Sequence, residues 1–557
     1  MTEVQTLRAR DNDAADSHLR VAWRFAPHNH ADQADIGRQS LRLFRPRGLS
    51  AAPLGVIKRM ECPMPTTSDF YKADFSSTLF PLKMNLLMFE HHAKELEEYI
   101  YQKILDDKQL GDNFLPQQRV HATKPRGHLR RTTKLDPVAE YFIYDLTNRN
   151  RSIFRKEVSE SRRSFGYRFV NGAHISVHTA FTAYKACLAD CGKKFKHNIK
   201  FDIASYFNSI YHHDLSHWFA GKDGVSAVDS NAFGKFLRDI NAGRSVDFLT
   251  QGIYPCKMIG NEFLKFIDLS AQLKSPMLVR FMDDFTLFGD DPEVLRQDFI
   301  RIQQLLGQYA LNVNPSKTYY DKKSGDLEKT LSTLQASLVE LVDDFEAVEG
   351  VSGAEVVEVE VGVKHFLNQE QINGLLGLLR DDSLEEFDAD LILNFLRSHS
   401  DDILEQLPTL LRKFPNLTKH IHSVCASVTE KAELASLILD YTKTDAFFLE
   451  YQLFWLACIV EDYLLGHGSY GEALFGLFEL SADHKIARAK VLEIPEQGFG
   501  LKEIRSEYLK TGQSDWLAWA SAMGSRSLKA AERNYALNYF SKGSPINHLI
   551  AECIKKL

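Results

Sequence analysis

Two short apolar segments that carry aspartates restrict most strongly what this chain can fold into. Asp202 lies in the run 201–210, and Asp283 and Asp284 lie in the run 280–285. Most flanking residues are apolar and strand-forming, so the aspartates are expected to be buried or half-buried. A buried carboxylate is costly unless something positive pairs with it. A pair of Mg²⁺ ions would satisfy both runs if the fold brings them together.

The residues around these runs predict a strand, a helical turn, a hairpin and a helix, in that order. Residues 195–203 are typical of a strand, and residues 278–288 of a hairpin that turns at 282–284. Pro292 opens the next helix, in which apolar residues recur every three or four positions. A polymerase palm requires this order of elements. Further helices are predicted over 86–105, 136–146 and 178–189, with a break at Gly192 and a loop over 312–318.

The composition indicates a globular protein of a reducing compartment. Of the 557 residues, 44% are hydrophobic and 25% are charged, and no apolar run is long enough to span a membrane. The N-terminal residues lack the apolar core of a signal peptide. The seven cysteines are scattered and odd in number, which argues against a disulfide framework. We therefore expect a cytoplasmic protein with no membrane partner.

Cys187 and Cys191 are four residues apart in a predicted helix. Zinc sites that hold a protein fold together need four ligands, and no second pair of Cys or His residues accompanies these two in register. Core packing is therefore favoured over zinc binding.

The net charge of −7 hides an asymmetry along the chain. Residues 119–200 contain 18 Lys or Arg and 6 Asp or Glu, a net charge of +12. Residues 321–361 contain 3 Lys and 11 Asp or Glu, a net charge of −8. A basic block just before Asp202 is what a nucleic-acid channel needs, although a solvated charged surface is the alternative.

These patterns divide the chain into four regions. Residues 1–63 lack sustained periodicity and are expected to be a disordered N-terminal extension, and residues 64–320 hold the predicted palm. Residues 321–365 form an acidic connector with some helix in 326–345. From 366 to 557 the pattern is helical, which predicts an all-α domain, either a HEAT-like solenoid or a compact bundle.

Several motifs resemble those of reverse transcriptases over about residues 85–320. Phe281-Met282-Asp283-Asp284 resembles the tyrosine-x-Asp-Asp box, with Phe in place of Tyr, and Asp202 with the residues after it resembles the first metal-binding motif. The other matching residues are Tyr206, Phe207, Ser209 and Ile210; Thr250, Gln251, Gly252, Pro255 and Asn261; Asn314, Lys317 and Thr318; and the aromatic-glycine segment from Arg163 to Gly172.

The resemblance implies a fold and a metal site. The fold would be α+β, with right-hand polymerase fingers and palm, an RRM-like antiparallel palm sheet, and the helical domain after it. Asp202 and Asp283 would bridge two Mg²⁺ ions, with Mn²⁺ as an alternative, and Asp284 would support the site. Ile203, next to Asp202, belongs to the predicted metal site.

The resemblance also implies residues that bind the nucleotide. An aromatic residue at Phe207 would sit beneath the sugar and exclude a 2′-hydroxyl, which predicts dNTP substrates and argues against an RNA-dependent RNA polymerase; plain core packing is the alternative. Lys317 would approach the triphosphate, although a surface role is nearly as well supported. The full predicted set is Phe207, Gln251, Gly252, Lys317, Arg151, Arg155 and Arg163.

Features outside the palm motifs favour one subfamily of reverse transcriptases over the others. The chain has no Cys/His-rich endonuclease and no Val-Thr-Gly triplet, which are typical of intron-encoded and retron enzymes. Residues 209–213, with Trp218 nearby, resemble the abortive-infection and defence-associated reverse transcriptases of bacteria. The resemblance implies antiviral defence, a homo-oligomer, and synthesis that is templated by a non-coding RNA, untemplated or protein-primed. The implied partners are an RNA template or non-coding RNA, the DNA product and dNTPs. Alternatives are a retron-like or mobile-element enzyme, and a nucleic-acid-binding helical scaffold with a decayed palm.

Overall fold

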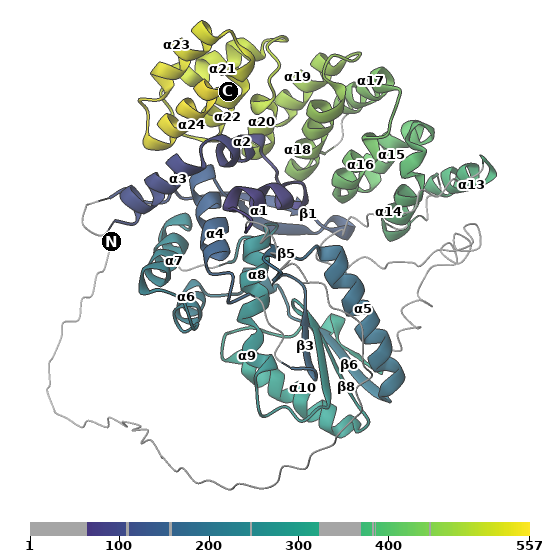
Figure 1. Cartoon of the computed structure of the whole chain (residues 1–557). Coiled ribbons are helices and arrows are strands. Elements are labelled where there is room, and N and C mark those ends of the chain that lie inside the picture. Colours follow the sequence, from purple (N-terminus) through teal and green to yellow (C-terminus); the bar gives the residue numbers. More distant parts are fainter. Residues whose placement is uncertain are drawn as a thin grey trace, which may run out of the picture. The chain divides into compact units, whose positions relative to one another are not determined.

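The computed structural model shows a helix-rich α+β protein with a small mixed sheet (Figure 1). The described residues belong to one compact unit. The predicted extension over 1–63 and nearly all of the acidic connector lie outside them. The structure describes residues 64–106, 111–154, 159–244, 248–321, 369–380, 384, 386–444 and 447–557.

A five-stranded sheet holds the aspartate-bearing runs, in the order β3-β7-β8-β6-β9. The predicted hairpin is confirmed, because β7 and β8 pair antiparallel with the turn at Met282 and Asp283. The predicted antiparallel sheet is wrong at one edge, where β3 runs parallel to β7. A long, largely helical connection separates these two strands in sequence, as a parallel pairing requires. The strands are β3 Arg162–Phe165, β6 His197–Asp202, β7 Met277–Phe281, β8 Asp284–Gly289 and β9 Tyr319–Tyr320.

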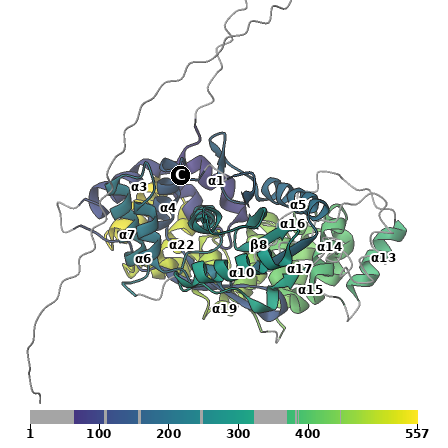
Figure 2. The same ribbon diagram turned by 90° about the horizontal axis from the view of Figure 1, so that it is seen from below.

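Two helices pack against this sheet. α10 (Pro292–Gly307) contacts β6 and β8, beside which it lies in both views (Figures 1 and 2), and α5 (Val177–Lys194) contacts β3 and β7. Asp291 accepts the N–H groups of Glu293 and Val294 and starts α10 at the predicted Pro292. The predicted break at Gly192 is wrong: the residue is exposed within α5, where a glycine costs only about 1 kcal/mol.

A second group of elements precedes and surrounds the strands of this sheet. The helix predicted over 86–105 is interrupted at His92, whose backbone leaves helical geometry, whereas α4 begins at Pro137 under the predicted Asp136 cap. β1 and β2 pair antiparallel as a hairpin. These elements are α1 Thr67–Asp74, α2 Lys83–His91, α3 Ala93–Tyr99, β1 Gln118–Thr123, β2 Leu129–Lys134, α4 Pro137–Arg149, β4 Phe169–Val170, β5 Ala173–His174, α6 His212–Ala220, α7 Ala227–Ile240, α8 Tyr254–Phe263 and α9 Lys265–Asp268.

Helices occupy the described residues from 369 onward. Most pack on the helix two positions further along the chain, as α16 does on α18 and α20 on α22. This pattern is typical of stacked helical pairs, and the HEAT-like solenoid stays a prediction. The helices are α13 Gln369–Leu379, α14 Glu386–Phe395, α15 Leu407–Lys413, α16 Thr418–Cys425, α17 Lys431–Thr442, α18 Glu450–Ile459, α19 Tyr470–Leu480, α20 Lys485–Glu493, α21 Leu501–Lys510, α22 Trp516–Gly524, α23 Ala530–Phe540 and α24 Pro545–Lys556.

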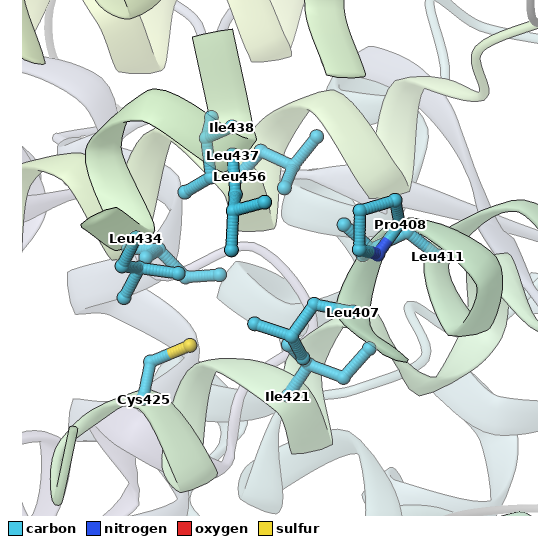
Figure 3. Close-up of a pocket in the computed structure, with 10 residues that line it drawn as sticks. Leu407, Pro408, Leu411, Ile421, Cys425, Leu434, Leu437, Ile438 and Leu456 are labelled. Carbon is cyan, nitrogen blue, oxygen red and sulfur yellow. The ribbon is translucent and has the colours of Figure 1, made fainter. Parts of the chain in front are cut away.

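A small apolar pocket lies among α15, α16, α17 and α18 (Figure 3). Leucine and isoleucine side chains such as Leu411, Ile421 and Leu456 line it, with the Cys425 thiol at one side. Within the described part of the chain, no helix combines the length and the apolarity needed to cross a bilayer.

The helices after residue 369 contact α2 through buried charges. The Glu493 carboxylate accepts the N–H groups of Lys83 and Met84, each at 2.9 Å, at the start of α2. Lys490 Nζ lies 2.6 Å from Glu461 and 2.7 Å from Glu493, and all three side chains are buried. The hydrogen bonds of the Glu493 carboxylate therefore join α20 to the start of α2.

Candidate active site

The pairing of β6 with β8 brings the three predicted aspartates to one end of the sheet. Asp202, the last residue of β6, lies directly opposite Asp284, the first residue of β8. Asp283 precedes Asp284 in the turn, and its carbonyl accepts the N–H of Ile203 at 3.3 Å. Residues 81 positions apart in sequence thus meet because the antiparallel register aligns the two strand ends.

A buried arginine holds the turn that carries Asp283. The guanidinium of Arg280 is wholly buried and donates two hydrogen bonds to Asp268, of 3.2 and 2.6 Å. Its Nη1 also donates to Asn261 Oδ1 at 2.8 Å and to the Met282 carbonyl at 3.0 Å. Met282 has a φ of +54°, a left-handed conformation that side chains other than glycine disfavour. The hydrogen bond to its carbonyl helps to hold this turn in place.

The electrostatics of the site favour a bound cation. Burial and the neighbouring charges of Asp202 and Asp284 raise the pKa of Asp283 from 3.8 to about 8. Burial raises the pKa of Asp284 to about 6, and nearby Lys200 opposes that rise. Burial and repulsion between carboxylates disfavour their ionised form, and a bound divalent cation would offset both effects.

Lys317 lies next to this cluster, and its predicted role in binding the triphosphate stays a prediction. Its Nζ is 3.2 Å from Asp202 Oδ2, and the N–H of Asn314 donates to the Asp202 carbonyl at 2.7 Å. The loop after α10 therefore reaches back to the end of β6. The lysine is about one-third exposed, so its charge also faces the solvent.

The β1–β2 hairpin contributes a further cation that was not expected from the sequence. Burial lowers the pKa of Lys124, just after β1, as do Arg130 and Lys317, whereas Asp283 and Asp202 raise it. Lys124 is thus within electrostatic range of both the aspartates and Lys317. The basic block over 119–200 was the available signal, but it could not single out this residue.

Phe207 lies in a turn that comes shortly after Asp202. Its carbonyl accepts the Leu249 N–H at 2.8 Å, and its ring is half-buried. A Cβ at Gly260 would come within 3.3 Å of the ring, so α8 approaches Phe207 closely. The ring therefore packs against α8.

The Gln251–Gly252 segment is attached to the β1–β2 hairpin. The Thr132 hydroxyl donates to the Gln251 carbonyl at 2.8 Å and accepts the Gln251 N–H at 3.0 Å. Gly252 has a φ of +91°, and a Cβ there would lie 2.4 Å from Leu79, so no larger residue fits. The structure thus joins the predicted base-pair segment to the hairpin that bears Lys124.

The predicted arginines make contacts elsewhere. Arg151 donates to the Asn148 carbonyl at 2.8 Å and packs over the Phe169 ring. Arg163 lies in β3, where its Nε donates to the Glu160 carbonyl at 3.0 Å. Arg155 lies outside the described residues. A role for the three arginines in nucleotide binding stays a prediction.

The aspartate cluster fits a divalent cation in chemistry and charge. Hard oxygen donors suit Mg²⁺, and Asp283 and Asp284 are half-buried carboxylates whose pKa values are raised. Among the described residues, no three His, Cys, Asp or Glu side chains converge closely enough to hold a metal ion alone. Mg²⁺ commonly binds through one or two carboxylates and takes its other ligands from water and substrate phosphates.

Comparisons with known proteins give no family assignment. No protein-family model matches the chain, and no curated protein matches its sequence. Among solved structures, apo telomerase from Candida tropicalis is similar with a TM-score of 0.31 and 13% identity, over 74% of this chain and 73% of that one. Telomerase from Candida albicans with a telomeric RNA fragment gives a TM-score of 0.26 and 12% identity, over 71% and 66%. Similarity at this level carries no argument about function.

Proposed function

We propose that this chain is a nucleotidyltransferase of the reverse-transcriptase type that joins deoxynucleotides into DNA. The observation that supports the proposal is the gathering of Asp202, Asp283 and Asp284 at one strand end, where burial and the neighbouring carboxylates raise the pKa values of Asp283 and Asp284. Lys317 and Lys124 add positive charge on the side of the cluster that a triphosphate would approach.

Asp202 and Asp283 would hold two Mg²⁺ ions, or Mn²⁺ in their place. Bound there, the ions would lower the pKa of the attacking hydroxyl and neutralise the leaving pyrophosphate. The chain's own residues orient the substrate. Lys317, whose Nζ lies 3.2 Å from Asp202, would turn its ammonium group toward the phosphates of the bound triphosphate. Lys124 would bind the same phosphates from the hairpin.

The substrate class is argued from Phe207. The ring is fixed between its own turn and Gly260, so it cannot move aside easily. A 2′-hydroxyl on the incoming sugar would collide with it, which favours dNTPs. Gln251 and Gly252, held to the hairpin by Thr132, would line the nascent base pair.

We extend the proposal to antiviral defence in the bacterial cytoplasm, with assembly into a homo-oligomer. The similarity of residues 209–213 to abortive-infection enzymes and the helical C-terminal region support this role. Synthesis directed by a non-coding RNA, untemplated synthesis and protein priming are its three possible modes. Sequencing of the nucleic acid that copurifies with the protein distinguishes them.

The enzymatic proposal is tested by DNA synthesis. Purified full-length protein with Mg²⁺ and labelled dNTPs should make acid-insoluble product, and Asp283→Ala should abolish it. Asp402→Ala, which changes an exposed aspartate in another Asp-Asp pair, is the matched control and should leave synthesis intact. Equal product from Asp283→Ala, or none from the wild type with nucleic-acid binding retained, would overturn the proposal in favour of a scaffold.

The defence role is tested separately in bacterial cells challenged with phage. Wild-type protein should lower plaque counts, and Asp283→Ala should restore them. Equal plaque counts for the wild type and Asp283→Ala, in a protein that synthesises DNA when purified, would favour a retron-like or mobile-element enzyme.

A further inference from the structure

Two cysteines of α5 and an arginine of β3 form a cluster. Cys187 and Cys191 lie one helical turn apart and are only 6% and 5% exposed. Both thiols are free of disulfide bonds. Arg163 of β3 places its Nη1 3.8 Å from the Cys187 sulfur. The cluster thus combines a sulfur atom, a thiol donor and a fixed positive charge.

These neighbours stabilise a thiolate at Cys187. The hydrogen bond from Cys191 and the charge of Arg163 lower the pKa of Cys187 to about 7, against burial and Asp190, which raise it. Cys191 correspondingly has a raised pKa, although Arg163 and Lys194 act in the opposite direction. Arg163 therefore favours a negative charge on Cys187, the sulfur that it contacts.

Other buried cysteines of the chain show what the same residue does without these neighbours. Cys256 and Cys425 are also buried and free, and burial raises the pKa of each thiol well above its ordinary value. Metal binding does not account for the pair, because no third His, Cys, Asp or Glu joins it in the described part of the chain. A positively charged neighbour that lowers the pKa of a thiol is typical of a reactive cysteine, and Arg163 is such a neighbour of Cys187.

We propose that Cys187 is a peroxide-reactive thiolate, with Arg163 and Cys191 as the groups that activate it. The Cys187 sulfur attacks one oxygen of a hydroperoxide, an S–O bond forms, and the O–O bond breaks. The sulfur loses two electrons and becomes a sulfenic acid, while the peroxide leaves as hydroxide or alkoxide and takes a proton from water. This site is independent of the proposed nucleotidyl transfer.

The helix determines the product of this oxidation. A disulfide needs Cβ atoms about 3.5–4.5 Å apart. Residues four apart on an α-helix are separated by about 6 Å along its axis. Cys191 therefore cannot close a disulfide with Cys187 while α5 is intact, and the sulfenic acid persists beside Arg163. Because α5 packs on β7, which leads into the Met282 turn, oxidation also lies close to the aspartate-bearing hairpin.

The test compares cysteines within one protein. Full-length protein is treated with hydrogen peroxide at neutral pH, trapped with a 1,3-dione reagent for sulfenic acids, and digested for mass spectrometry. Cys187 should be labelled at least about tenfold faster than Cys256 and Cys425, the internal controls. Arg163→Gln should slow the labelling about tenfold, Arg163→Lys should restore most of it, and Cys187→Ser should remove it.

A second measurement covers the case in which a substitution disturbs folding. In the wild-type protein, the pH profile of Cys187 alkylation by iodoacetamide should have its midpoint near the thiol's pKa of about 7, well below the ordinary thiol pKa of about 8.5. Labelling of Cys187 no faster than that of Cys256, a midpoint at or above the ordinary value, or a Cys187–Cys191 disulfide as the main product would each overturn the proposal.

Discussion

Arg280 and Asp268 form a fully buried ion pair just behind the turn that carries Asp283, with two hydrogen bonds of 3.2 and 2.6 Å. Since the same guanidinium also binds the Met282 carbonyl, the pair links the stability of the palm to the placement of Asp283. Arg280→Gln leaves the Asp268 carboxylate buried without its partner. We expect the free energy of unfolding to fall by about 3–5 kcal/mol, measured by urea denaturation.

The matched control for that substitution is Arg296→Gln, which changes an exposed arginine on α10. Surface pairs contribute little, so the control should shift the free energy of unfolding by less than about 1 kcal/mol. An Arg280→Gln midpoint equal to that of the control would show that the buried pair does not hold the palm.

The raised pKa of Asp283 predicts how stability depends on pH when no divalent cation is present. In the unfolded chain the group titrates near its ordinary value of 3.8, whereas in the folded protein its pKa is about 8. Between these values the folded state holds a proton that the unfolded state has released, so the free energy of unfolding falls as the pH rises. Asp283→Asn should remove the contribution of Asp283 to this decrease in the free energy of unfolding. Thermal unfolding at pH 5 and pH 8 in EDTA measures it.

Added Mg²⁺ should have the opposite dependence on pH. A cation that binds Asp283 must displace its proton, so stabilisation by Mg²⁺ should be larger at pH 8 than at pH 5. Equal thermal shifts at the two pH values, or shifts that survive Asp283→Asn, would contradict a cation at this carboxylate.

Lys124 should contribute to binding the triphosphate. Removal of a charge-assisted hydrogen bond costs about 1.5–3 kcal/mol, so Lys124→Gln should raise KM for dNTP by about tenfold or more. Lys94→Gln, at an exposed lysine on α3, is the control and should leave KM unchanged. Steady-state kinetics give the comparison. Equal KM values for Lys124→Gln and Lys94→Gln would show that the β1–β2 hairpin does not contribute to the substrate site.

Phe207 should set the choice of sugar. Phe207→Ala opens space beside Gly260 and should raise ribonucleotide incorporation relative to deoxynucleotide incorporation by at least about tenfold, since a lost steric clash is worth more than about 1.4 kcal/mol. Phe195→Ala changes another half-buried phenylalanine, which precedes β6, and should not alter the ratio. An unchanged ratio in Phe207→Ala would reduce its ring to a packing role.

The parts of the palm that could be predicted from the sequence are those fixed by local pattern. Apolar strands around Met282 predict the hairpin, and the Asp291-Pro292 pair predicts where α10 begins, because a cap and a first-turn proline act within one helical turn. The approach of Asp202 to Asp284 could also be predicted from the sequence, because Asp202 ends one strand and Asp284 begins another.

Other features depend on contacts distant in sequence. The parallel pairing of β3 with β7 results from how the intervening helices pack, which no local pattern records. Lys124 comes within electrostatic range of Asp202 and Asp283 only because the folded chain brings the β1–β2 hairpin near them, and the basic block does not single out this lysine. Asp268 similarly gains its role only where α9 meets Arg280.

The shared cation site of the three aspartates is tested most directly by Mn²⁺ binding, measured by electron paramagnetic resonance at pH 8 with dNTP present. We predict that wild-type protein and Asp402→Asn bind Mn²⁺, and that Asp202→Asn and Asp283→Asn each lose most of this binding. Undiminished Mn²⁺ binding in both Asp202→Asn and Asp283→Asn would contradict the site.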